Sequence, residues 1–183
     1  MANLCTTSYV LVGNDDKVKE LRSHLQQLKD TERTVSPIDP TWIGYIVQDI
    51  LGKKWEEVYC RGEWDFSWKD DEDANTHLRI YTNTAWNACN ECFSELAEKY
   101  NLAMFYVSEE LGCGIYETND GQHTYFPDEI IVTSEDDTEY LEGREKVMEY
   151  INQHLGTDFK DWDTMLSDET VGDVFNIYEM EEV

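Results

Sequence analysis

Basic residues are scarce in this chain. It holds 14 Lys and Arg against 40 Asp and Glu, which gives a formal net charge of -26 over 183 residues. A field of that sign repels nucleic-acid backbones and anionic membranes, and it attracts basic partners. The composition therefore argues against direct nucleic-acid or membrane binding and favours a basic or amphipathic protein partner.

Long apolar segments are also missing. No apolar run approaches the roughly 18 residues that a membrane-spanning helix needs. Residues 1–12 are uncharged but include Asn3 and Thr6, and no basic segment precedes them, so we do not expect a signal peptide. Because 40% of the residues are hydrophobic and 13% are aromatic, the acidity belongs to a folding protein rather than to an acidic tail.

The cysteines are too few, and odd in number, for a disulfide framework, so we expect a reducing cytoplasmic location. A zinc site normally needs four Cys or His ligands, and an iron–sulfur cluster needs about four cysteines at short spacings. Cys89-x-x-Cys92 is one pair only, although Cys113 and His123 are further ligand types. We therefore predict buried core cysteines and no metal or cofactor. The five cysteines are Cys5, Cys60, Cys89, Cys92 and Cys113.

Catalytic motifs are absent. The sequence has no Gly-x-Ser-x-Gly, no His-Glu-x-x-His and no phosphate-binding loop. We therefore predict no catalytic residues and a protein that is not an enzyme. An enzyme with a carboxylate pair in a cleft remains an alternative, because single carboxylates cannot be singled out among 40. The histidines, His24, His77, His123 and His154, fall in no such motif.

The pattern that is present predicts an α+β fold. Asn14 is placed to cap a helix in which Val18, Leu21 and Leu25 share one face. The full order is β-α-(α)-β-β-α-β, which is the ferredoxin-like antiparallel sheet (βαββαβ) with an inserted helix. We expect strands near 4–12, 57–68, 77–82 and 102–108, and helices at 14–28, 39–51 and 86–100, with Trp86 on the apolar stripe of the last helix.

Beyond residue 108 the sequence predicts two additions. A short strand near 114–118, a turn at 119–121 and a return strand at 123–133 form an extra hairpin at the sheet edge. Residues 135–183 then hold 16 acidic and 3 basic residues, with helical patterns that include one stopped by Gly156. We therefore divide the chain into a ferredoxin-like domain, 1–133, and an acidic helical C-terminal extension, 134–183, packed on the same domain.

Four short motifs are recognisable in the first two thirds of the chain: the start at residues 1–5 leading to Gly13, the segments 60–63 and 84–86, and 108–112 after a strand. In combination they resemble the YubB-type ferredoxin-like proteins of plasmids and phages. Leu4 stands where that family usually has Trp, and no Pro follows Trp86. The resemblance implies a ferredoxin-like fold without an iron–sulfur cluster and a mobile-element or gut-bacterial origin. It transfers no catalytic residue.

Two groups of residues are candidates for partner binding. One face of the strand at 57–68 carries Trp64, Phe66 and Trp68, which we expect to lie in the core or at an interface. Stacking of nucleic-acid bases on these rings is disfavoured, because the acidic Glu63 and Asp65 alternate with them. The second group is the acidic run that opens the C-terminal extension. The candidates are Trp64, Trp68, Glu135, Asp136, Asp137, Glu139, Glu142 and Glu145.

These features predict a non-enzymatic, strongly acidic interaction protein that binds a basic protein surface. One alternative is a DNA mimic, whose carboxylates copy phosphate spacing and block a host nucleic-acid-binding or defence protein. The sequence leaves homodimerisation open.

Overall fold

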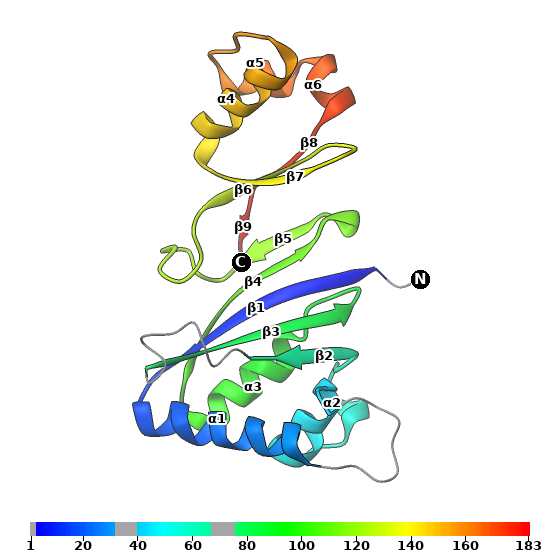
Figure 1. The fold of residues 1–183 in the computed structure, drawn as a ribbon. Coiled ribbons are helices and arrows are strands. Elements are labelled where there is room, and N and C mark those ends of the chain that lie inside the picture. Colours follow the sequence, from blue (N-terminus) through cyan, green and yellow to red (C-terminus); the bar gives the residue numbers. More distant parts are fainter. Residues whose placement is uncertain (1–2, 32–39, 67–75) are drawn as a thin grey trace. The chain divides into compact units, whose positions relative to one another are not determined.

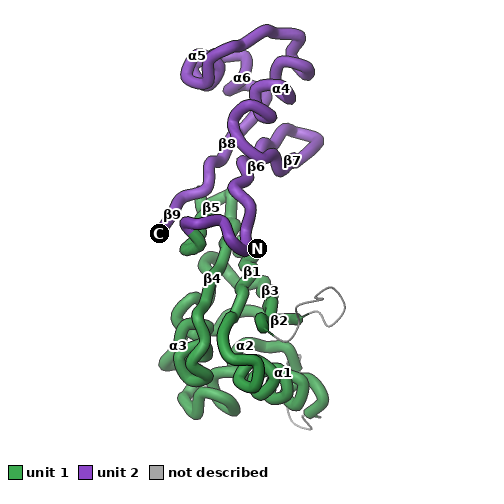
Figure 2. The backbone as a smooth tube through the Cα atoms, turned by 90° about the vertical axis from the view of Figure 1, so that its left-hand side faces the viewer, with its two compact units in different colours: residues 1–120 green, residues 121–183 purple. Residues whose placement is uncertain are grey.

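The structure, a computed structural model, describes residues 3–31, 40–66 and 76–183 (Figure 1). The chain divides into two compact units, Met1–Asp120 and Gly121–Val183 (Figure 2). Trp68, Asp39 and the polar turn expected at 69–75 lie outside the described residues.

Unit 1 is built on an antiparallel sheet. Its strands lie in the order β2-β3-β1-β4-β5, with each neighbouring pair antiparallel. The first four have the connectivity of a split βαβ fold, so the predicted ferredoxin-like sheet is confirmed. The strands are β1 (Leu4–Val12), β2 (Gly62–Asp65), β3 (His77–Ala85), β4 (Ala103–Glu110) and β5 (Ile115–Thr118).

Two helices, α1 (Asp15–Asp30) and α3 (Asn90–Tyr100), cover one face of this sheet (Figure 1). The side chain of Asn14 accepts a hydrogen bond from the Asp16 backbone N–H at 3.0 Å, so the predicted cap is confirmed. The Tyr9 ring stacks on Phe93 with centroids 4.2 Å apart, which joins β1 to α3. The core of unit 1 therefore lies between the sheet and these helices.

The inserted helix differs from the prediction. Residues 43–45 form the short α2 (Ile43–Tyr45), and η1 (Ile46–Leu51) continues as a π-helix. The element ends at Gly52, whose left-handed φ of 72° is the predicted stop. A 3-10 turn, η2 (Trp55–Glu57), follows.

The helix predicted to begin at Trp86 begins at Asn90 instead, with Cys89 at its N-cap. Trp86 is 44% exposed with φ of 73°, so its placement on the apolar stripe is wrong. The physical reason is that β3 extends to Ala85, paired with Leu4, and the chain must turn before a helix can start. Cys89 and Cys92 are buried, as predicted.

Unit 2 has its own sheet, in the order β7-β6-β8, and its own hydrophobic core. Ile130 and Val132 of β6 pack with Val147 and Ile151 of α4 in that core. The elements are β6 (Glu129–Thr133), β7 (Thr138–Glu142), α4 (Gly143–Leu155), α5 (Trp162–Leu166), α6 (Glu169–Val174), β8 (Asn176–Tyr178) and β9 (Glu181–Glu182).

The hairpin predicted across 114–133 is wrong. β5 pairs with β4, whereas β6 pairs with β7 and β8. Asn119, expected in a hairpin turn, instead uses its side chain on β4: it accepts from the Tyr106 N–H at 2.8 Å and donates to the Met104 carbonyl at 2.9 Å. Before β5, the tight turn expected at 112–114 is confirmed: it is the 3-10 turn η3 (Leu111–Cys113), which ends at Gly114 with a left-handed φ of 72°.

The acidic extension is likewise not purely helical. Three strands of the second sheet belong to residues 121–183, and the compact units divide after Asp120 rather than after residue 133. A boundary at 133 would separate β6 from β7, its hydrogen-bonded partner. The predicted packing of the extension on the first domain stays a prediction.

Candidate functional site

The acidic candidates gather on one hairpin and the helix that follows it. The turn between β6 and β7 is closed by Ser134, whose N–H donates to the Asp137 carbonyl at 2.8 Å and whose hydroxyl accepts from the Asp137 N–H at 3.2 Å. We call the six side chains the acidic hairpin surface; all are exposed except Glu139, which is intermediate. They are Glu135, Asp136, Asp137, Glu139, Glu142 and Glu145.

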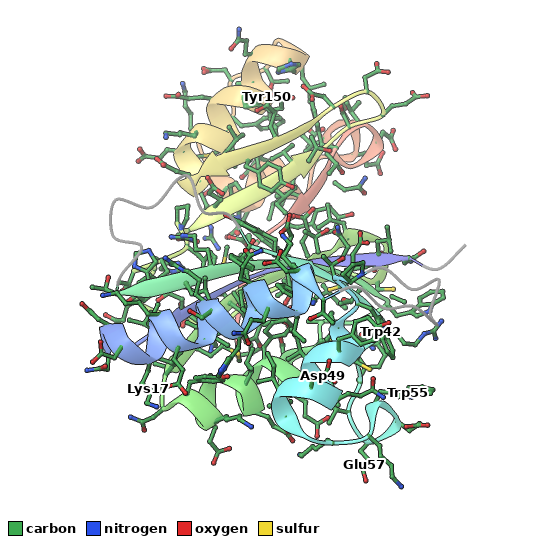
Figure 3. All side chains as sticks on the ribbon, turned by 60° about the horizontal axis from the view of Figure 1, so that its bottom comes forward. Lys17, Trp42, Asp49, Trp55, Glu57 and Tyr150 are labelled. Atoms are coloured by element: carbon green, nitrogen blue, oxygen red, sulfur yellow. The ribbon has the colours of Figure 1, made fainter. Side chains whose placement is uncertain are left out.

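Few cations interrupt this surface. Lys146 pairs with Glu142 at 2.7 Å, and that hydrogen bond and charge lower the pKa of the Glu142 carboxyl. Glu129 lies opposite Glu142 in the β6–β7 ladder, and its pKa is raised, first by burial and then by the Glu142 charge. Tyr150 of α4 (Figure 3) has a pKa raised by burial and then by Asp137 and Glu139. Arg144, which lies between Glu142 and Glu145 in the sequence, pairs with Glu179 at 2.7 Å. Among the described residues, carboxylates therefore outnumber cations at this surface.

The aromatic candidate that the structure describes, Trp64, lies in the core rather than on a surface. Trp64 is 1% exposed and stacks on Phe66 with centroids 5.8 Å apart, inside the core of unit 1. It therefore acts as a packing residue, and a partner cannot reach its ring without opening that core. Trp68 lies outside the described residues.

The cysteines lie mostly within the core. Burial raises the pKa of Cys89 to about 12 and also raises the pKa of Cys92 and Cys5. Thiols so placed stay protonated at neutral pH and are poor metal ligands or nucleophiles. Across the part of the chain that the structure describes, no three His, Cys, Asp or Glu side chains are arranged to hold a metal ion.

A pocket of about 420 Å³ opens between α1, η1 and α3. The Tyr100 hydroxyl lies 2.5 Å from His24 Nδ1, and Lys99 donates to the Ile50 carbonyl at 2.5 Å. Leu28 adds an apolar wall. We did not predict this polar group from the sequence. The signal that could have indicated it is that His24 directly precedes Leu25, which belongs to the buried apolar stripe of α1.

A strained turn joins β3 to α3. The Asn87 N–H donates to the Ala85 carbonyl at 2.9 Å across Trp86, whose φ is 73°. This is a γ-turn of the rare positive-φ form. For a bulky residue such backbone costs on the order of 1–3 kcal/mol, because Cβ crowds the neighbouring carbonyl. No pattern in the sequence signals it, because the preceding strand and the following helix both favour ordinary backbone at Trp86.

The comparisons with known proteins agree with the fold. The sheet order and the helices on one face define an α+β protein of the ferredoxin-like class. A family model described as the ferredoxin-like domain in Api92-like protein matches residues 63–179, which is more than half of the chain. The chain therefore belongs to this family. No curated protein and no solved structure matches it.

Proposed function

We propose that this protein is a non-enzymatic interaction protein that binds a basic protein surface through the acidic hairpin surface. The observation that carries the proposal is the concentration of charge in unit 2, where residues 121–183 hold 18 acidic and 3 basic side chains. Complementary charge steers association and sets which partners are accepted. A field this strong favours Lys- and Arg-rich partners over neutral ones.

The proposal extends to the origin and the cellular location of the protein. The short motifs shared with YubB-type proteins support a plasmid, phage or gut-bacterial origin, and free cysteines support a cytoplasmic location. Within the described residues, no helix has the length and apolar character to cross a bilayer.

Binding of an oligolysine peptide, measured by calorimetry over a series of salt concentrations, tests the proposal. Replacing Glu135, Asp136 and Asp137 by Gln, Asn and Asn should weaken binding and flatten its salt dependence. The matched control replaces Asp15, Asp16 and Glu20, three exposed acids of α1. If both sets of substitutions weaken binding equally, only the overall negative charge of the protein matters and not the acidic hairpin surface. If neither set changes binding, the proposal is wrong.

The second candidate is a DNA mimic that blocks a host nucleic-acid-binding or defence protein. The run of exposed acids at 135–137 favours it, because a mimic needs carboxylates in rows with few interposed bases. A mimic would displace duplex DNA from such a protein in competition assays, whereas a binder of other basic surfaces would leave the DNA bound.

A further inference from the structure

Trp86 stands where backbone geometry favours glycine. Of the described residues with positive φ, four are glycines, which carry no Cβ penalty, and Asn101 caps the end of α3. Trp86 has the largest side chain among them and also a half-exposed ring. Neither the turn nor the core explains a Trp at this position.

The surrounding structure holds the turn in place from several segments. The Trp86 N–H donates to the Asn3 carbonyl at 2.9 Å, and the Thr84 hydroxyl donates to the Asn87 carbonyl at 2.6 Å. The Tyr59 hydroxyl donates to the Ala85 carbonyl. Strain that is over-determined in this way is typical of functional positions.

The neighbours of Trp86 have the composition of a binding hot spot. Leu4, 65% exposed, pairs with Ala85 on one side, and the Arg61 carbonyl accepts from the Ala85 N–H at 2.9 Å on the other. Trp, Tyr and Arg are the residues that most often dominate interface energies. We call Leu4, Tyr59, Arg61 and Trp86 the anchor patch.

Charges near the anchor patch indicate the kind of partner. Exposed Glu63 lies two residues from Arg61, and Glu91 lies in the first turn of α3, just after the turn. Acids therefore outnumber Arg61 around the apolar group, so a complementary surface is basic at its rim and apolar at its centre.

We infer that Trp86 is the apolar anchor of a docking surface for a protein partner that presents an apolar face within a basic surface. This inference rests on the proposed function, because the partner is the same basic protein. It adds that charge alone does not hold the complex, and that an indole fixed by a strained turn provides short-range affinity.

Two peptides that contain the same number of lysines test the inference: oligolysine, and a longer amphipathic leucine–lysine helix. The whole protein should bind the amphipathic peptide about tenfold or more tightly than oligolysine, as expected for a buried aromatic anchor. Trp86→Gly and Trp86→Ala should remove that difference and leave oligolysine binding unchanged. The matched control is Tyr81→Ala, which removes another half-exposed aromatic from β3.

The thermal stability of the Trp86 variants distinguishes a binding role for this side chain from a packing role. Trp86→Gly should keep the melting temperature within about 4 °C of the wild type, because relief of strain offsets the lost contacts. A larger fall in melting temperature would show that Trp86 is a packing residue and would overturn the inference. The inference also fails if Trp86→Gly still prefers the amphipathic peptide, or if Tyr81→Ala loses that preference to the same extent. If oligolysine fails to bind while the Trp86-dependent binding persists, the proposed function falls and the anchor stands.

Discussion

The Tyr100 hydroxyl and His24 Nδ1 lie 2.5 Å apart and join the last turn of α3 to the middle of α1. Burial, followed by the charge of Glu20, raises the pKa of Tyr100 to about 12 from its ordinary value of 10.0. The hydroxyl therefore keeps its proton at neutral pH, where it can donate to the imidazole ring.

This raised pKa predicts a loss of stability in strong base. Above pH 10 the unfolded chain releases the Tyr100 proton while the folded chain retains it, so the free energy of unfolding falls as pH rises from 10 towards 12. Below pH 10 Tyr100 contributes no pH dependence. Denaturant titrations of the wild type and Tyr100→Phe across this range measure the effect, and parallel profiles for the two proteins would contradict it.

The stacked rings of Tyr9 and Phe93 predict a large cost for truncation. Phe93→Ala should destabilise the protein by about 3–5 kcal/mol, because it leaves a cavity against β1. Tyr81→Ala should stay within about 0.5 kcal/mol, as expected at the surface. Denaturant midpoints give both values, and similar losses for the two variants would show that the core is not where the structure puts it.

The five cysteines should differ sharply in reactivity. Cys113 is exposed, whereas the other four are buried and should react with alkylating reagents only after unfolding. A hydrogen bond with Glu110 is the main cause of the raised pKa of Cys113. Glu110→Gln should therefore lower that pKa and speed alkylation at neutral pH. Mass spectrometry of the labelled protein reads out each site, and unchanged labelling in Glu110→Gln would refute the assigned cause.

Added salt should raise thermal stability. Forty carboxylates repel one another in the folded state, and salt screens that repulsion over about 10 Å at 0.1 M. Melting curves in sodium chloride, with an uncharged osmolyte at equal osmolality as the control, separate screening from solute exclusion. A melting temperature that falls with salt would mean that ion pairs such as Arg144–Glu179 outweigh the repulsion.

Much of unit 1 could be predicted because local and long-range signals agree there. Asn14 caps α1, the stripe that includes Leu21 and Leu25 is buried, and Gly52 ends η1, all as the residue types require. Trp86 could not be placed, because its position depends on groups far away in the sequence: its N–H donates to the Asn3 carbonyl, and the Tyr59 hydroxyl donates to the carbonyl of the preceding Ala85.

The candidate site was predicted only in part. Exposed acids such as Glu135 are recognisable from composition, because charged side chains stay in water. Period-two alternation assigned Trp64 to one face of its strand, but it does not indicate whether helices cover that face and bury the ring. Asn119 was misassigned because an Asn side chain can pair with a strand backbone as well as form a turn.

The central position of β1 has a consequence for how the protein is made. Thr7 of this strand bonds to Thr82, 75 residues later, and to Ser108, 101 residues later. A nascent chain therefore carries both edges of β1 unpaired until β3 and β4 have left the ribosome. Long loops must close before the sheet exists, which slows folding and leaves unpaired strand edges and apolar side chains exposed during synthesis. The dense negative charge counters the aggregation that such a delay invites, because molecules of the same sign repel one another.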